Sequence, residues 1–191
     1  MTSKEKIKNS SLLTTFIKVR RSELFWILTF SVLTALSAQV AVPTQPVPFT
    51  LQTMLVLLSG AFLGSRNGAY SQILYLVIGV IGVPVFAGFT FGVAKLFGPT
   101  GGYLLTFPFA AFLVGYILEK KNNSFLIILS FIAGQLLIFL AGALYLSVFI
   151  GGDFSKAFFS GAVIFSVWDI IKTVAAFSIY KAVSKKYPKL P

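Results

Sequence analysis

The sequence contains no cysteine and no histidine. Without cysteine the chain has no disulfide, no thiol nucleophile and no thiolate metal ligand. Without histidine it lacks the usual catalytic base at neutral pH and a common metal ligand. The sequence also has no match to G-x-x-x-x-G-K-[ST], the loop that cradles nucleotide phosphates. We therefore expect no metal site and no ATP hydrolysis by that loop, so active transport would need a partner or an ion gradient.

Charged residues are also scarce, and acidic ones most of all. Only 5 of the 191 residues are acidic and 11% are charged, whereas about 25% are charged in a typical soluble domain. Hydrophobic residues make up 57% of the chain, and the mean hydropathy is +0.89. Four runs of 42, 28, 23 and 31 residues carry no charge: Leu24–Ser65, Asn67–Ala94, Leu96–Leu118 and Asn122–Gly152. Because about 20 apolar residues cross the hydrocarbon, and lipid requires internally bonded backbone, we predict an all-α integral membrane protein.

The uncharged runs divide into six predicted spans. The longest run is too long for one crossing, and three prolines at positions 43, 46 and 48 interrupt it, because proline disfavours helix. The polar triplet Arg66-Asn67-Gly68 predicts a tight turn, and an ordered apolar outer loop joins the third and fourth spans. The predicted spans are Leu24–Val42, Phe49–Gly64, Ala69–Val83, Tyr103–Leu118, Ser124–Ile150 and Ala157–Val183.

These spans define the domain organisation and the orientation. Residues 24–183 form one compact six-helix bundle between a basic leader, 1–23, and a basic tail, 184–191. Thirteen of the 16 basic residues fall on the side of the two termini; Lys95 and Lys156 fall on the other side, and Lys172 lies within a span. Cytoplasmic loops of membrane proteins carry an excess of lysine and arginine. We therefore expect both termini on the cytoplasmic side of a bacterial plasma membrane. The same charge predicts contact with the lipid bilayer rather than nucleic acid. We expect the first span to be retained, although ALSAQVA has small residues spaced for cleavage.

The stretch FSVWDIIKT places Asp169 and Lys172 inside the last predicted span. At 1.5 Å per residue, Asp169 is about 18 Å from a helix start at Ala157, which is close to the bilayer midplane. Lys172 lies on the same helix face, since positions i and i+3 are neighbours. Each such charge costs roughly 2.5–3.5 kcal/mol on insertion scales. A polar ligand site, a structural ion pair and an ion relay are the three interpretations, and the lack of other acids within spans argues against the relay.

Other polar and aromatic residues are predicted to converge on this pair from the outer side. Gln52 offers neutral hydrogen bonds, either to a ligand or between helices. The segment GPTGGY opens the fourth span and is either an ordinary helix start or a site where free N–H groups meet an acceptor. Aromatic side chains at positions 86, 89, 91 and 103 are candidates for an apolar wall. The candidate substrate-binding residues are Asp169, Lys172, Gln52, Phe86, Thr100, Gly101 and Tyr103.

Small residues recur every four positions in two places. One set is Gly60, Gly64 and Gly68, and the other lies along the first span. Such faces let helices approach closely, and they serve either packing within the bundle or docking of another membrane subunit. For docking we favour the first span, with Ser31, Thr34, Ala35 and Ala38 as the candidate residues.

Three segments together resemble a known family. They are LTALSAQVAVP, VPFTLQTMLVLLSGAFLGSRNGAYSQILYLVIGVIGVPVFAG and FGPTGGYLLTFPFAAFLVGYI, and the similarity resumes at DIIK. They resemble the biotin-specific substrate-binding (S) component of energy-coupling factor vitamin transporters. The family has an aspartate followed three positions later by a lysine, which falls on Asp169 and Lys172. It usually has proline and glycine just before that aspartate, where this chain has Ser166, Val167 and Trp168.

The resemblance implies a six-helix, non-enzymatic subunit that captures extracellular biotin with high affinity and needs no cofactor. It implies a membrane-embedded coupling subunit, docked on the small residues of the first span, and two cytoplasmic ATPase subunits. Asp169 would accept hydrogen bonds from the ureido N–H groups of biotin. Lys172 would donate either to the ureido oxygen, which we favour, or to the carboxylate, and the tail would then point toward Lys95 or the backbone of residues 98–102. An intramembrane enzyme and a purely structural membrane subunit are the alternatives.

Overall fold

The computed structural model describes residues 22–161 and 166–186, and this part of the chain is mostly helical. Its long helices are α2 (Glu23–Gln39), α3 (Gln52–Val80), α5 (Gly101–Lys120), α6 (Ser124–Ser147) and α8 (Ser166–Ser184). The short elements are β1 (Ala41–Val42), β2 (Phe49–Thr50), α4 (Val93–Leu96), the 3-10 helix η1 (Val148–Ile150) and α7 (Phe154–Gly161). The predicted all-α class is therefore confirmed for the described residues, apart from one two-stranded ribbon in which Ala41 pairs with Thr50.

Helix α3 is a hairpin of two helical arms. Its turn lies at Gly64, which has φ 80° and ψ −177°, a conformation that favours glycine. The arms then run back along each other, so a Cβ on Gly68 would lie 2.8 Å from Cα of Gly60. The predicted turn at Arg66-Asn67-Gly68 is wrong, because these residues already belong to the second arm. The glycine repeat thus serves packing within the chain.

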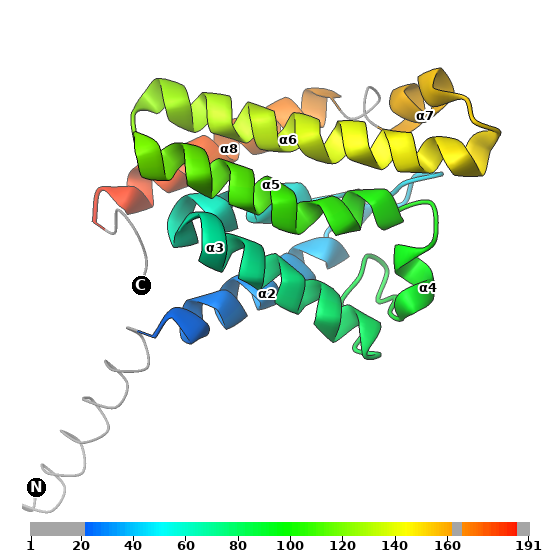
Figure 1. Ribbon diagram of the computed structural model, residues 1–191, viewed down its shortest axis with the longest axis horizontal. Helices are drawn as coiled ribbons and strands as arrows, with labels where there is room; N and C mark the ends of the chain where they lie inside the picture. Colours follow the sequence, from blue (N-terminus) through cyan, green and yellow to red (C-terminus); the bar gives the residue numbers. More distant parts are fainter. Residues whose placement is uncertain (1–21, 162–165, 187–191) are drawn as a thin grey trace, which may run out of the picture.

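The helices lie in a bundle with the α3 hairpin at its centre (Figure 1). Helices α5 and α6 run side by side on one side of α3, and α2 packs on its other side. The start of α2, the α5–α6 turn and the end of α8 lie at one end of the bundle, while α4 and α7 lie at the opposite end (Figure 1). We call the end with α4 and α7 the outer end.

The last predicted span does not correspond to one described helix. Helix α7 ends at Gly161 and α8 begins at Ser166, and residues 162–165 lie outside the described residues. Among the described residues, two helices are long and apolar enough to cross a membrane, Gly101–Lys120 and Ser124–Ile150. Six spans and cytoplasmic termini therefore stay predictions, and the leader, residues 1–21, lies outside the described residues.

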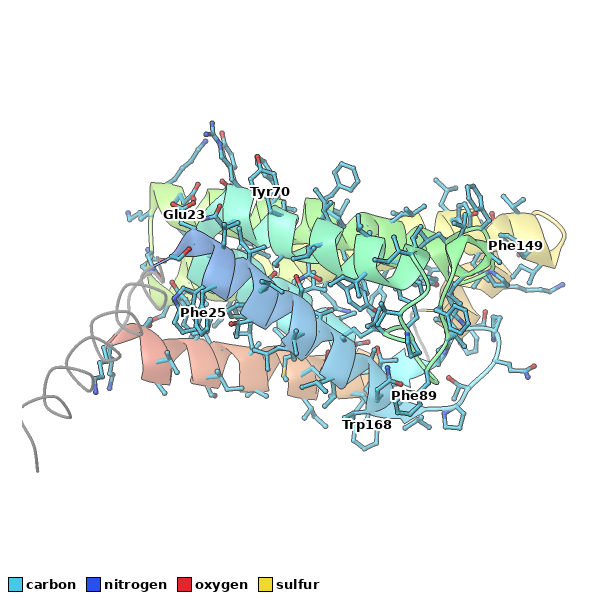
Figure 2. The ribbon with its side chains drawn as sticks, turned by 90° about the horizontal axis from the view of Figure 1, so that it is seen from below. Glu23, Phe25, Tyr70, Phe89, Phe149 and Trp168 are labelled. Carbon is cyan, nitrogen blue, oxygen red and sulfur yellow. The ribbon has the colours of Figure 1, made fainter. Side chains whose placement is uncertain are left out.

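The surface of the bundle is rich in large apolar side chains. Helix α2 exposes a stripe at every fourth position, Leu24, Leu28, Val32 and Leu36, and α6 exposes Leu136, Leu140 and Leu144. Helix α8 is exposed on most of its circumference, and Trp168 points away from the bundle (Figure 2). Extended apolar surfaces of this kind suit contact with lipid rather than water.

Candidate ligand-binding site

A cavity lies near the outer end, where five segments of the chain meet. The β2 strand and the first arm of α3 form one wall, and the loop after α3, the start of α5 and helices α6 and α8 form the others. We call it the Asp169 cavity; it contains about 600 Å³ of space between atoms, its open mouth included. Its polar lining comes from Thr50, Gln52, Thr53, Lys95, Thr100, Tyr103, Asp169 and Lys172.

Lys172 is held at the edge of this cavity by three separate acceptors. Its Nζ lies 2.5 Å from Oδ1 of Asp169, and it donates to the backbone oxygen of Thr50 at 3.1 Å and to Oγ1 of Thr53 at 2.7 Å. The ring of Phe49 adds a cation–π contact, with its centroid 4.4 Å away. An ammonium has three N–H donors, so these contacts occupy all of them. Lys172 thereby ties α8 to β2 and to the start of α3.

Asp169 is less fully bonded than its partner. It lies in the first turn of α8 and is 5% exposed. Its Oδ2 has no hydrogen-bond donor among the described residues. A buried carboxylate oxygen without a donor is costly, because it has lost water and gained nothing in return. The cavity therefore presents a free, negatively charged acceptor to whatever enters it.

Gln52 and Tyr75 form a neutral network beside this pair. The Nε2 of Gln52 donates to Oη of Tyr75 at 2.6 Å, and that hydroxyl donates to the backbone oxygen of Val85 at 3.3 Å. The hydroxyl of Thr50 donates to Oε1 of Gln52 at 3.0 Å. Gln52 thus bridges the two arms of α3 and also faces the cavity, so both of its predicted uses are compatible with its position.

Phe86 forms part of the apolar wall. It is fully buried, packs edge-on against Tyr75 at a centroid distance of 5.6 Å, and occupies the space that a side chain at Gly79 would need. Gln39, in the last turn of α2, holds the loop that carries it. The side-chain amide of Gln39 donates to the backbone oxygen of Phe86 at 3.1 Å and accepts from the backbone N–H of Phe89 at 3.0 Å.

Tyr103 enters the cavity from the first turn of α5. Its ring occupies the space that side chains at Gly142 of α6 and Gly161 of α7 would need, so two glycines form its slot. The hydroxyl is buried and has no hydrogen-bond partner among the described residues. The cavity thus offers two kinds of unpaired polar group, the Asp169 carboxylate and the Tyr103 hydroxyl.

The structure brings most of the candidate substrate-binding residues together. Six of them line the cavity: Asp169, Lys172, Gln52, Phe86, Thr100 and Tyr103. Gly101 does not line the cavity. A Cβ at this position would clash with the backbone oxygen of Leu96, so glycine is needed here to let the two backbone segments approach each other. Of the further aromatic candidates, Phe89 and Phe91 are exposed, and Figure 2 shows Phe89 near the end of α2.

The predicted docking face on the first helix stays a prediction, and three of its four residues are buried within the bundle. Ser31, Thr34 and Ala38 are at most 1% exposed, because they pack against the second arm of α3. The hydroxyl of Ser31 donates to the backbone oxygen of Ser71 at 2.6 Å, and Ala35 is half-buried beside them. The alternative use, packing within the bundle, is the one that the structure shows.

Three residues near the cavity were not among the candidates. Tyr75 and Gln39 position the walls, and Gln135 of α6 is a buried amide whose Nε2 has no partner among the described residues. The sequence carries one signal for Gln135, which is a lone amide within an otherwise apolar stretch of α6. Nothing in the sequence alone shows that it points toward α8.

Fold and cavity together define a class: a helical membrane protein that encloses a small, partly charged ligand site near one end of its bundle. A family model described as the BioY family matches residues 7–189. The chain belongs to the BioY family.

Individual relatives agree with this assignment. A Pyrococcus horikoshii protein named "Probable biotin transporter BioY" is 40% identical over 158 residues, which is 83% of this chain and 93% of that protein. The "Biotin transporter BioY" of Thermotoga maritima is 40% identical over 147 residues, 77% of this chain and 86% of that protein. The crystal structure of the S-component for biotin from an ECF-type ABC transporter superposes with a TM-score of 0.80 at 26% identity, covering 97% of this chain and 95% of that one.

Proposed function

We propose that this chain captures extracellular biotin with high affinity, as the substrate-binding subunit of an ATP-driven vitamin transporter in a bacterial plasma membrane. The observation that carries the proposal is the Asp169 cavity, with its unpaired buried carboxylate oxygen. The named relatives are biotin transporters, and the structural relative is a biotin S-component. A ligand that brings N–H donors to the carboxylate would remove its desolvation cost.

Biotin matches this arrangement group by group. Its ureido ring has two N–H donors and one carbonyl acceptor, and its valerate tail ends in a carboxylate. The free Oδ2 of Asp169 would accept from a ureido N–H, in a charge-assisted hydrogen bond about twice as strong as a neutral one. Lys172 would reach the ureido oxygen only by giving up Thr50 or Thr53, since its three donors are occupied. The tail would extend toward Lys95, which also lines the cavity.

Uptake would require partners. The chain carries no loop of the phosphate-binding pattern, so energy would come from two cytoplasmic ATPase subunits through a membrane-embedded coupling subunit. Both termini would face the cytoplasm, because the α5–α6 turn with Lys120 and Lys121 and the end of α8 with Lys181 lie at the end of the bundle away from the cavity (Figure 1). The cavity near the outer end would then open toward the substrate.

Isothermal titration of the purified protein with biotin tests the proposal. We expect one saturable site, and we expect Asp169→Asn to weaken binding by about 10- to 100-fold, since hydrogen bonds to charged groups contribute about 1.5–3 kcal/mol. Asp153→Asn, on the exposed 151–153 turn, is the matched control and should leave the affinity unchanged. Unchanged affinity in Asp169→Asn would contradict the site, and conversion of the ligand would favour an enzyme instead.

A further inference from the structure

A second hollow lies between α6 and α8 and meets the Asp169 cavity. We call it the α6–α8 groove; most of its lining is apolar, with Ile132 and Leu136 from α6 and Ile170 and Val174 from α8. Phe139 and Asp169 line both the groove and the cavity. A molecule bound against Asp169 is therefore next to the groove as well.

The groove contains one polar side chain that the fold does not explain. Gln135 is 8% exposed, and its Nε2 has no hydrogen-bond partner among the described residues. The groove's other neutral polar side chain, Thr173, is satisfied, because its hydroxyl donates to the backbone oxygen of Asp169 at 2.7 Å. The unpaired polar atoms that face the groove are therefore the Gln135 amide nitrogen and the Asp169 carboxylate.

Gln72 of α3 is a fully buried glutamine that joins helices within the bundle. The two N–H groups of Gln72 Nε2 lie among three acceptors, the hydroxyls of Thr34, Ser59 and Ser71, at 3.3, 3.1 and 3.1 Å, while its Oε1 has no partner among the described residues. Those bonds join α2 to both arms of α3. The Gln135 nitrogen makes no such bond, so its burial costs free energy that packing within the chain does not return.

A ligand with adjacent donor and acceptor groups would satisfy the unpaired atoms together. Asp169 supplies an acceptor, whereas the nearby ammonium of Lys172 has no N–H to spare. A carbonyl on the ligand therefore needs another donor, and Gln135 has one free. One edge of a cyclic urea presents N–H and C=O side by side, which matches the C=O and N–H of a side-chain amide.

We propose that Gln135 contacts the substrate, its amide pairing with one N–H/C=O edge of the ureido ring while Asp169 accepts from the other N–H. The inference rests on the proposed function, because it names a further residue of the same site. It places the ureido ring where the cavity and the groove meet, beside Phe139, and leaves the tail toward the mouth of the cavity.

The test compares biotin with 2-thiobiotin, whose urea oxygen is replaced by sulfur, a weaker hydrogen-bond acceptor. Titration calorimetry of the full chain should show that Gln135→Leu weakens biotin binding by about tenfold or more, as loss of the two hydrogen bonds of the amide–urea pair predicts. Because thiobiotin already forms the weaker bond, its affinity should fall by a smaller factor. The matched control is Ser130→Ala, which removes a buried hydroxyl of α6 that donates to the backbone of Ile127 and does not line the cavity; it should leave both affinities unchanged.

The ratio of the two affinities separates a contact from a structural role. Equal weakening of both ligands in Gln135→Leu would overturn the inference, because a structural defect does not distinguish oxygen from sulfur. Unchanged biotin binding would overturn it as well. If the leucine variant does not fold, Gln135→Met provides the same comparison with a longer, flexible side chain. A wild-type chain that fails to bind biotin at all would instead contradict the proposed function.

Discussion

The chain contains two Asp–Lys pairs with the same spacing, and their surroundings differ completely. Asp153 and Lys156 lie at the start of α7 with 38% and 79% of their side chains exposed, and the two charges are 3.3 Å apart. Asp169 and Lys172 lie at the start of α8 with 6% and 8% exposed, and their charges are 2.5 Å apart. Each pair spans one helical turn, so spacing alone does not distinguish them.

The exposed pair is explained by its own helix. Asp153 accepts from the backbone N–H of Lys156 at 3.0 Å, as a helix N-cap does. That backbone hydrogen bond, followed by the contact with the lysine side chain, lowers the pKa of the Asp153 carboxyl. Water screens the charges, so the ion pair itself adds little. The buried pair is screened less, because its side chains are only 6% and 8% exposed, and it leaves one carboxylate oxygen open to the cavity.

The largest predicted effect comes from neutralising the buried pair as a unit. In Asp169→Asn/Lys172→Met we expect biotin binding to fall by up to about 100-fold, because the charged acceptor is gone. Stability should change little, since a buried ion pair replaced by similar-sized neutral residues is often neutral or stabilising. Titration calorimetry and thermal unfolding in the same detergent measure the two quantities separately.

The exposed pair supplies the control for that experiment. Asp153→Asn/Lys156→Met makes the same chemical change at the same spacing and should leave biotin affinity within about twofold of wild type. If the buried double variant instead binds biotin normally but unfolds at a much lower temperature, the pair is a structural lock and the comparison between the two pairs concerns stability only.

Lys95 is intermediate between the exposed and the buried Asp–Lys pairs, because its charged side chain is half-buried and also lines the cavity. If the biotin carboxylate lies near it, Lys95→Met should weaken biotin about tenfold, within the range for a partly screened charge contact. Biotin amide, which lacks the negative charge, should bind wild type about tenfold more weakly than biotin does and should not respond to the substitution. A collapse of amide binding to wild type would instead assign the carboxylate to Lys172.

Much of the fold and of the site could be predicted from the sequence. Uncharged runs and prolines predicted a first span ending at Val42 and a second beginning at Phe49, and the structure ends and begins these helices three residues away, at Gln39 and Gln52. Asp169 and Lys172 could be identified as a candidate site because a charged side chain within a membrane span is energetically costly, whichever helix carries it. The turn of α3 was misplaced because Arg66 and Asn67 are polar, whereas the chain reverses at Gly64, where a positive φ is required.

Contacts between distant segments could not be predicted. The side chain of Glu119 reaches across to the α3 turn, where it accepts from the backbone N–H of Ser65 at 3.0 Å and from its hydroxyl at 2.9 Å. The small residues of α2 predicted close packing, but a pattern every four positions does not say which helix it meets, and here it meets the second arm of α3. The pairing of Gln39 with the loop after α3 is a third contact of this kind.

Gln39 gives the smallest predicted effect, and it tests whether a neutral clamp contributes to a site dominated by charge. Gln39→Leu removes the bonds to the backbone of Phe86 and Phe89 and leaves the buried wall residue Phe86 in its slot against Gly79. We expect about threefold weaker biotin binding, since only part-buried hydrogen bonds are lost. Amide hydrogen exchange over residues 81–92 should accelerate.

A comparison of Gln39→Leu with Gln39→Glu separates the hydrogen bonds that Gln39 donates from the one that it accepts. Glutamate keeps the acceptor for the N–H of Phe89 but cannot donate to the carbonyls of Val85 and Phe86, which would then face a carboxylate. The glutamate variant should therefore show faster exchange at residues 85–87 than at Phe89, whereas the leucine variant accelerates both. Unchanged exchange in both variants would mean that Phe86 is held by packing alone and that the clamp on α2 contributes nothing to the site.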